Sequence, residues 1–381
     1  MNRKAAGRVA AGHPWIFQSD VVETGGAAPG DAVRVVDPAN RLLGTAHYSA
    51  ASQITLRMLD SNATEIGRDF FRARIAAAQA HRDRVVRQTN AYRLVHAEAD
   101  RLPALIIDRY GDCFVVQTQN QGMDRAKEEI LAVLDELYAP RAMVLRNDAS
   151  VRKLEKLPLE KLVVRGTLPE VLEVEMNGLT LRADLMEGQK TGVFLDQREN
   201  YVAAQRHARG KALDCFASTG GFALHLAQCC EQVEAVDASP FALATAQANA
   251  ARHGMANITF KEADVFALLT GYVAARRRFD TIVLDPPAFA KSKQTVDKAL
   301  AGYKDINLRA LKLLEPGGVL ISCSCSHHVS EAALLEVIAE ASIDVGRTLR
   351  VLERRLQAAD HPVLLTVPET LYLKYVALEV I

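Results

Sequence analysis

From about residue 205 onward, short apolar runs alternate with stretches of helical pattern, and this alternation constrains the fold more than any other feature of the sequence. The runs KALDCFA, VEAVDAS, ITFKEADV, FDTIVLDPP and GGVLISCS are predicted to be strands, with helices from Gly221, from Pro240 and near 304–314. Strands that recur with helices between them predict an α/β fold with a doubly wound, mostly parallel sheet. Because ligands of such sheets bind at the carboxyl ends of the strands, we expect the site there.

The preceding part of the chain has a different pattern. At 381 residues, the chain is long enough for two or three domains. In about the first 65 residues, the runs DAVRVVD, RLLGTAHYS and QITLRML predict a small β-barrel or sandwich. A basic helix is expected at 70–90, followed by strands around a helix near 124–138. A hairpin turning at Asn177-Gly178 is expected to close this compact α+β module.

Composition excludes several classes of protein. No apolar run approaches the roughly 20 residues that a membrane helix needs, and the start of the chain lacks the apolar core of a secretory signal. The six cysteines are clustered instead of being spaced as a disulfide framework. We therefore expect free thiols, a cytoplasmic location and no membrane partner.

The formal net charge is zero, so a global basic field cannot steer this protein to nucleic acid. Local basic patches remain: the arginines between 72 and 87, residues 276–278, and Lys291 with Lys293. Taken alone, the basic helix at 70–90 is explained at least as well by an ordinary solvated face.

Acidic residues stand at three successive strand ends. Asp214 opens the loop 214–221, whose two glycines would let a ligand approach the backbone. Since the dinucleotide motif G-x-G-x-x-G is absent, this loop alone is either a ligand loop or a tight turn. Asp237 comes 23 residues later, about where nucleotide-binding folds contact a ribose, and Asp264 is placed to meet an adenine. Three carboxylates in a row are hard to explain structurally, because each needs a partner.

The fourth strand runs into Asp285-Pro286-Pro287. The two prolines restrict the backbone to a rigid, extended turn. Such a turn can hold the carboxylate of Asp285 against the edge of a flat heterocycle. A plain proline turn after a buried strand is the structural alternative.

The fifth strand ends in ISCSCSHHV, residues 321–329, where cysteines, serines and histidines crowd together. Three roles are open for Cys323 and Cys325. They could be small buried side chains, they could be metal ligands together with His327 and His328, or one of them could be a nucleophile. Cys-x-Cys beside adjacent histidines has the wrong spacing for a zinc site, so no metal is expected. Alternation sends both cysteines to the same face of a regular strand, so periodicity alone leaves the choice between them open.

Together, these motifs resemble those of the class I S-adenosylmethionine-dependent methyltransferases over residues 194–326. Over nearly its full length, the chain is similar to the RlmI-type 23S rRNA cytosine-C5 methyltransferases. The similarity lies in GHPWIFQSDV, RLVHAEADRLPALIIDRYGD, VFLDQREN, DPPAFAKSK, SCS, QAADHPV and ETLYLK. It implies a PUA-like RNA-binding domain at 1–66, a central α+β domain at 67–185 and a Rossmann-like methyltransferase domain at 186–381.

The resemblance also implies S-adenosyl-L-methionine as the cofactor. The residues that it places around this cofactor are Phe194, Asp196, Gln197, Arg198, Asp214, Phe216, Ser218, Thr219, Gly220, Gly221, Asp237, Ala238, Ser239, Asp264, Val265, Asp285 and Pro286. The implied partner is 23S rRNA or a large-subunit assembly intermediate, and a homodimer is kept as an expectation for the assembly.

The implied reaction needs a thiol. Cytosine C5 is a weak nucleophile, so a cysteine thiolate first adds to C6, after which C5 takes the methyl group and loses its proton. The resemblance aligns Cys325 with the nucleophile of the family, whereas Cys323 is expected to be a small buried residue. Asp285 is expected to bind the cytosine at N3 and N4.

Two details around this thiol stay open in the sequence. His327 and His328 are either loop residues, or one of them lies close enough to lower the pKa of the thiol. Ala288 follows Pro287, where many RNA cytosine-C5 methyltransferases have a second cysteine. The base that removes the C5 proton is therefore not identified.

Two other functions share parts of the pattern. An N-methyltransferase acting on a purine or another base uses an (Asp/Asn)-Pro-Pro-aromatic motif and needs no cysteine, but Phe289 stands one residue late for that motif. A non-catalytic RNA-binding ribosome-assembly factor would keep only a vestigial cofactor pocket. The intact acidic strand ends argue against that alternative.

Overall fold

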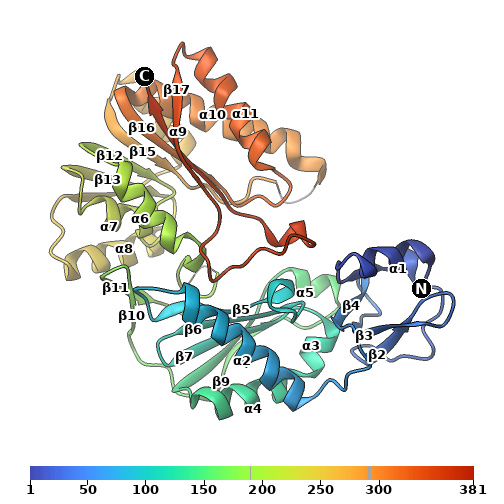
Figure 1. Cartoon of the computed structure of the whole chain (residues 1–381). Helices are drawn as coiled ribbons and strands as arrows, with labels where there is room; N and C mark the ends of the chain where they lie inside the picture. The colour runs from blue at the N-terminus through green and yellow to red at the C-terminus, as the bar shows by residue number, and fades with distance from the viewer. Residues whose placement is uncertain (189, 291–292) are drawn as a thin grey trace. The chain divides into compact units, whose positions relative to one another are not determined.

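The computed structural model describes residues 1–188, 190–290 and 293–381, and these divide into two compact units (Figure 1). Unit 1 contains Met1–Gly178, Ala183–Val193 and Ala359–Thr370. Unit 2 contains Leu179–Arg182, Phe194–Ala358 and Leu371–Ile381. Each unit has its own hydrophobic core.

Unit 2 is built on a seven-stranded sheet with the order β14-β13-β12-β15-β16-β18-β17. Its strands are β12 (Lys211–Cys215), β13 (Gln232–Asp237), β14 (Ile258–Glu262), β15 (Phe279–Leu284), β16 (Leu314–Ser324), β17 (Leu349–Arg355) and β18 (Lys374–Val380). The strands β12 to β16 are parallel, whereas β18 is antiparallel to both β16 and β17. This confirms the predicted doubly wound, mostly parallel sheet, to which an antiparallel pair is added at one edge.

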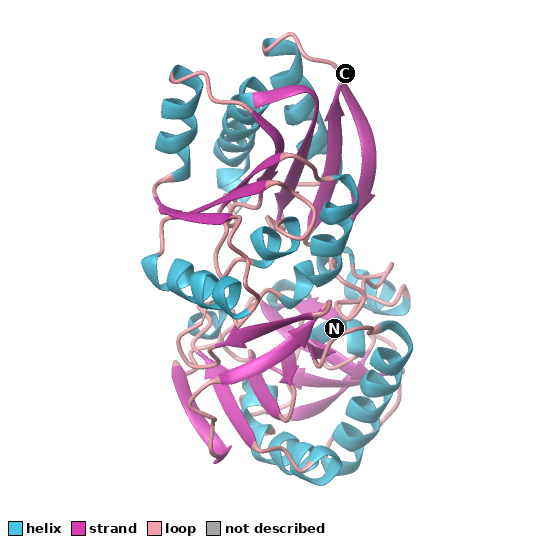
Figure 2. Ribbon diagram, turned by 90° about the vertical axis from the view of Figure 1, so that its left-hand side faces the viewer, coloured by secondary structure: helices cyan, strands magenta, loops and turns pink. Residues whose placement is uncertain are grey.

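Helices flank this sheet (Figure 2). They are α6 (Arg198–His207), α7 (Gly221–Leu226), α8 (Pro240–Arg252), α9 (Val265–Ala274), α10 (Val296–Leu313) and α11 (Glu331–Asp344). The core contains Leu269 of α9 and Tyr303 and Ile306 of α10, packed with Ile282 of the sheet. The helix predicted near 304–314 begins earlier than expected, because Gly302 interrupts the pattern without ending the helix.

The first sheet of unit 1 has the order β1-β4-β3-β2. It consists of β1 (Trp15–Phe17), β2 (Ala32–Val36), β3 (Leu42–Tyr48) and β4 (Ile54–Asp60), and it is antiparallel throughout. The strands β2, β3 and β4 correspond to the three β-rich runs of the sequence. The helix α1 (Arg3–Ala10) precedes them.

The second sheet of unit 1 has the order β5-β6-β7-β8-β9. It consists of β5 (Ala91–His96), β6 (Leu105–Tyr110), β7 (Cys113–Thr118), β8 (Ala142–Asn147) and β9 (Glu160–Gly166), with α2 (Arg68–Val85), α3 (Gln121–Arg125), α4 (Lys127–Tyr138) and α5 (Val151–Leu154). Phe71 and Ile75 of α2 and Leu134 of α4 share one core with this sheet. The predicted helices at 70–90 and near 124–138 are thus confirmed as α2 and α4.

The predicted hairpin is formed by β10 (Leu172–Met176) and β11 (Leu179–Ala183). Its turn residues Asn177 and Gly178 have φ values of 53° and 81°. Two positive φ values are what a two-residue hairpin turn of type I′ requires, and Asn-Gly is the pair that adopts them most readily.

Buried charges of unit 1 are paired with one another. Arg82 of α2 donates to both carboxylate oxygens of Asp100 at 2.5 and 2.7 Å and to the backbone carbonyl of Asp360 at 2.8 Å. Arg93 of β5 donates to both oxygens of Asp108 at 2.7 and 2.9 Å. The carboxylate of Asp360 accepts from the backbone N–H of Arg93 at 2.8 Å. These bonds fasten the segment around Asp360 to α2 and β5.

Candidate cofactor and catalytic site

The loop after β12 has an unusual backbone. Phe216, Ser218 and Gly220 have positive φ values of 64°, 48° and 89°. Glycine adopts this conformation readily, whereas two other residues in one short loop do so only when tertiary contacts hold them. One such contact is the backbone N–H of Ser218, which donates to a carboxylate oxygen of Asp237 at 2.9 Å.

Gly221 is required at the start of α7 by the close approach of Tyr201. A Cβ atom at Gly221 would lie 2.3 Å from Cζ of Tyr201. The ring of Tyr201 is buried and meets Phe222 edge-on with centroids 4.8 Å apart. Burial, followed by the nearby Asp285, raises the pKa of Tyr201 well above its usual value. Sequence reasoning missed Tyr201, although the Gly-Gly pair signals that something packs closely here.

Asp214 on β12 is fully buried, and neither carboxylate oxygen has a hydrogen-bond partner among the described residues. Burial, followed by the proximity of Asp285, raises its pKa well above the usual range. The hydroxyl of Ser218 is buried without a partner in the same described set. An uncompensated buried carboxylate destabilises a folded chain. Such a group indicates a place where a ligand supplies the missing donor.

The other two acidic strand ends have structural partners, so the prediction that all three are hard to explain structurally is wrong for them. Asp237 ends β13 and also accepts from the N–H of Ser239 at 2.8 Å. Asp264 lies beyond the end of β14, where it is the N-cap of α9 and accepts from the N–H of Ala267 at 2.8 Å. An N-cap carboxylate stabilises its helix without any ligand. Asp214 is therefore the one of the three whose surroundings indicate a ligand.

A chain of amide hydrogen bonds orients Asp285, which follows β15. Nε2 of Gln197 donates to Oδ1 of Asp285 at 3.0 Å, and Oε1 of Gln197 accepts from Nδ2 of Asn200 at 2.7 Å. Oδ1 of Asn200 accepts from Nε of Arg355 at 3.0 Å. Because Asn200 donates to the oxygen of Gln197, the nitrogen of that amide is directed at Asp285. Asn200 and Arg355 carry no signal in the sequence that would have identified them.

The strand β16 ends at Ser324, between the two cysteines. Cys323 is fully buried and lies opposite Tyr375 of β18. Burial, followed by the proximity of Asp285, raises the pKa of Cys323 well above its usual value, so this thiol stays protonated. Cys325 lies beyond the strand and is partly exposed, with Sγ 3.8 Å from the carbonyl oxygen of Pro286. The two thiols therefore differ in exposure, which strand periodicity could not reveal.

The residues after Cys325 are held in place by contacts to Ser326. Its hydroxyl accepts from the N–H of Ala290 at 3.3 Å and lies 3.1 Å from the hydroxyl of Tyr303. The carbonyl of Ser326 accepts from Nζ of Lys374 at 2.6 Å. Lys374 is a further residue of this region that the sequence did not single out.

His327 does not act as a cation beside the thiol. The residue lies on the exposed loop, but partial burial of its ring, followed by the charge of Lys374, lowers its pKa, so the imidazole is neutral near neutral pH. Its ring lies 5.4 Å from that of Tyr372. Across residues 1–188, 190–290 and 293–381, no group of histidine, cysteine and acidic side chains is arranged to hold a metal ion.

The remaining predicted residues lie in unit 2 near the same strand ends or in the segment 194–198. Asp196 accepts from the hydroxyl of Tyr372 at 2.7 Å. Arg198 is buried and forms an ion pair with Glu199 at 3.3 Å. Val265 is the buried first residue of α9. These contacts are internal to the chain, so a role of these residues toward a cofactor stays a prediction.

Three of the five arginines in the predicted basic patch on α2 are paired with carboxylates. Arg72 pairs with Glu136 at 2.8 Å, and Arg74 pairs with Asp60 at 2.7 Å. Arg82 is buried against Asp100. The spacing of arginines along the helix was visible in the sequence. These acidic partners lie outside the helix, so the sequence pattern did not reveal them.

The second predicted basic patch, residues 276–278, is also partly neutralised by acidic partners. Arg277 pairs with Glu234 at 2.8 Å and lies over the ring of Tyr272, 4.1 Å from its centroid. Of the third patch, Lys291 and the side chain of Lys293 lie outside the described residues.

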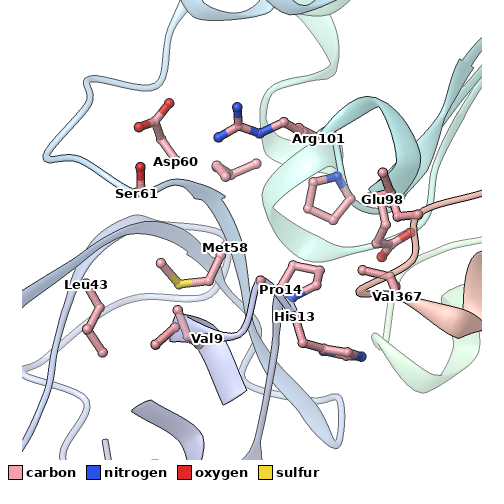
Figure 3. A pocket seen from close by; sticks show the side chains of 15 residues that line it. Val9, His13, Pro14, Leu43, Met58, Asp60, Ser61, Glu98, Arg101 and Val367 are labelled. Atoms are coloured by element: carbon pink, nitrogen blue, oxygen red, sulfur yellow. The ribbon is translucent and has the colours of Figure 1, made fainter. Parts of the chain in front are cut away.

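A separate cavity of ≈ 320 Å³ lies within unit 1 (Figure 3). Val9, Leu43 and Met58 form an apolar wall, and Asp60 and Arg101 stand at the opposite edge (Figure 3). This combination of an apolar wall and a few polar groups is typical of small-molecule pockets. The helices of the described residues include none that is both long and apolar enough to cross a membrane.

Comparisons with known proteins agree with this architecture. Residues 1–61 match the PUA-like domain, and residues 155–364 match the family described as S-adenosylmethionine-dependent methyltransferase. The chain is 43% identical to the ribosomal RNA large subunit methyltransferase I of Shewanella amazonensis, over 95% of this chain and 94% of that protein. It is 40% identical to the protein of that name from Escherichia coli, with the same two coverages.

Solved structures share the fold. The crystal structure of SMU.776, a methyltransferase complexed with SAH, matches with a TM-score of 0.87 at 20% identity, over 99% of this chain and 98% of that one. A SAM-dependent methyltransferase from Streptococcus mutans matches with a TM-score of 0.84 at 20% identity and the same coverages. At this level of identity, the likeness shows the fold alone.

Proposed function

The chain belongs to the family of the ribosomal RNA large subunit methyltransferases I, with S-adenosylmethionine as methyl donor, and from this premise we propose that it methylates C5 of a cytosine in 23S rRNA through a bond between Cys325 and C6. The observation that carries the proposal is the partial exposure of Cys325 beside the Asp285-Pro286 turn, while Cys323 is buried. The thiol that can be reached is the one that lies at the carboxyl ends of the parallel strands.

The residues at these strand ends fit S-adenosylmethionine. Its ammonium group and ribose hydroxyls are hydrogen-bond donors, and the buried oxygens of Asp214 have no donor among the described residues. We assign the loop 216–221, Asp237 and Asp264 to the same binding site. When bound, the cofactor supplies an electrophilic methyl group.

The reaction begins with the thiolate of Cys325. It adds to C6 of the cytosine, so a C–S bond forms and an electron pair moves onto C5. C5 then accepts the methyl group and loses its proton to a base. The electron pair of the C–H bond restores the double bond between C5 and C6, the C–S bond breaks, and the thiolate leaves.

Asp285 is proposed to hold the cytosine by N3 and N4 during this addition. A proton shared with N3 would make C6 more electrophilic as the thiolate adds. The bond from Gln197, itself oriented by Asn200, keeps the carboxylate at one orientation. Pre-orientation of this kind lowers the barrier because no group has to reorganise when charge develops.

The RNA substrate is assigned from the relatives, whose name states that they act on ribosomal RNA of the large subunit. The PUA-like match and the cavity of unit 1 support a role for that unit in holding RNA. We retain the division into domains at 1–66, 67–185 and 186–381, a cytoplasmic location and a homodimer as parts of this proposal.

The test replaces the nucleophile. Cys325→Ala should abolish methylation of large-subunit rRNA while S-adenosylmethionine binds with unchanged affinity, because the thiol acts on the cytosine only. Methylation is read as bisulfite-resistant cytosines in rRNA from a deletion strain complemented with each variant, and affinity is read by calorimetry.

Cys323→Ala is the matched control, since it removes a neighbouring thiol of the same strand. It should leave methylation nearly unchanged. Full activity of Cys325→Ala would remove the covalent mechanism and favour methylation of an exocyclic or ring nitrogen.

A further inference from the structure

Lys374, the first residue of β18, is a buried cation in unit 2. The residue is 4% exposed. Its Nζ donates to the backbone carbonyls of Ser326 at 2.6 Å and Tyr372 at 2.8 Å. No ion pair joins Lys374 to a carboxylate in the part of the chain that the structure describes. A buried ammonium without a counter-ion destabilises the fold, so its presence requires an explanation other than stability.

The position of Lys374 is set by the strand that carries the two cysteines. Lys374 pairs in register with Ser324, the residue before Cys325. Its ammonium binds the carbonyl of Ser326, the residue after Cys325. Lys374 is thus linked to the chain on both sides of the partly exposed thiol, through its backbone at Ser324 and through its ammonium at Ser326.

The pKa of Lys374 also indicates that its ammonium interacts with Cys325. Burial lowers the pKa of Lys374 to about 8, and the neighbouring Cys325 counteracts that effect. A cation and a thiol that influence each other in this way stabilise the thiolate in return, because the interaction is mutual.

Among the described residues, the other titratable groups near Cys325 that have shifted pKa values are neutral or acidic. Burial raises the pKa values of Cys323 and of Tyr303 on α10, so both stay neutral. Partial burial of its ring lowers the pKa of His327, so this imidazole is neutral as well. Asp285 is an acidic group of the same region and opposes a second negative charge. His328 follows on the exposed loop, and Lys374 is the buried cation of the set.

We propose that Lys374 is the counter-ion of the Cys325 thiolate, a positioning residue that keeps the nucleophile ionised. The inference deepens the proposed function and rests on it in taking Cys325 as the nucleophile. The competing explanation is structural, with Lys374 only tying the backbone of Ser326 to β18.

The experiment measures the ionisation of Cys325 directly. Full-length wild type and Lys374→Met are treated with iodoacetamide over a range of pH, without RNA or cofactor, and alkylation of each cysteine is followed by peptide mass spectrometry. Cys229, which is exposed, is the reference thiol within the same chain. Alkylation of Cys325 at pH 7 should slow about tenfold in Lys374→Met, while Cys229 keeps its rate.

Lys374→Arg provides the second variant, because it keeps the charge and changes the shape. It should retain most of the wild-type rate at Cys325. Equal rates of Cys325 in wild type and Lys374→Met would overturn the proposal, and so would a loss in Lys374→Arg as large as in Lys374→Met. Unfolding of a variant is recognised separately, because the buried Cys215 and Cys323 would then react too.

The readout does not depend on methyl transfer. If Cys325→Ala stays active while Lys374 still controls alkylation of Cys325, the proposed function fails and the counter-ion remains. If Cys325→Ala is inactive and Lys374→Met alkylates like wild type, the nucleophile remains and the counter-ion fails.

Discussion

The two units differ in whether their buried charged side chains have partners of opposite charge. In unit 1, Arg82 and Arg93 each face a carboxylate that accepts two hydrogen bonds from the guanidinium. In unit 2, Asp214 and Lys374 are buried without an ion pair among the described residues. Removing one partner of a buried pair leaves an uncompensated charge, so paired charges belong to the scaffold. Buried charges without a protein partner are found where a ligand or a reacting group completes them, which marks the site.

The largest loss of stability is expected when one member of a buried ion pair is removed. Arg82→Met removes a fully buried guanidinium and leaves Asp100 without its partner. The free energy of unfolding should fall by about 3–5 kcal/mol. Urea unfolding followed by the fluorescence of Trp15, the single tryptophan and a residue of unit 1, measures this directly.

The double variant with Arg82→Met and Asp100→Leu sharpens that result. Removal of both charges should recover much of the lost stability, because no buried charge is then left alone. A loss below about 1 kcal/mol in the single variant would contradict the distinction between the two units.

The next effect is expected at Asp214. Asp214→Asn keeps the shape of the side chain and removes its charge. The affinity for S-adenosylmethionine should fall by about 100-fold, or roughly 2.7 kcal/mol, while the free energy of unfolding stays the same or rises. Calorimetric titration and urea unfolding of the same sample give both values.

Asp264→Asn is the matched control for the stability measurement on this variant. Asparagine is as good an N-cap as aspartate, so α9 should keep its stability. A loss of stability in Asp214→Asn as large as in Arg82→Met would show that Asp214 is a scaffold residue after all.

The smallest effect is expected in the pH dependence of the protein without cofactor. The folded-state pKa of Asp214 is raised, so in the window above about pH 3.9 the folded state binds a proton that the unfolded state releases. Stability therefore falls as pH rises from there to the folded-state pKa, by up to about 1.4 kcal/mol per pH unit. Asp214→Asn should lose this slope. Parallel curves of stability against pH for wild type and variant would contradict the assignment.

Much of the fold followed from local patterns. The alternation of apolar runs and helical stretches after residue 205 predicted the parallel sheet, and Asn177-Gly178 predicted the hairpin. Such predictions succeed because the period of apolar residues and the φ preferences of glycine and asparagine act within a few neighbouring residues. The carboxyl ends of the strands were located by the same reasoning.

The partners of charged and polar side chains did not follow from the sequence. Asp285 is held by Gln197, and Asn200 is held by Arg355, at separations of 88 and 155 residues. Three arginines of the predicted patch on α2, Arg72, Arg74 and Arg82, have acidic partners outside the helix. Contacts of this kind depend on how distant segments pack, and no local period encodes them.

The sequence by itself determined that a parallel sheet would present acidic residues and a thiol at one edge. The tertiary structure decided which carboxylate lacks a partner and which thiol is exposed. The reason is physical: β18 pairs with β16 only as far as Ser324, so Cys323 is enclosed by the sheet and Cys325 lies beyond it. Two cysteines that are equivalent by strand periodicity are thereby separated into a buried thiol and a candidate nucleophile.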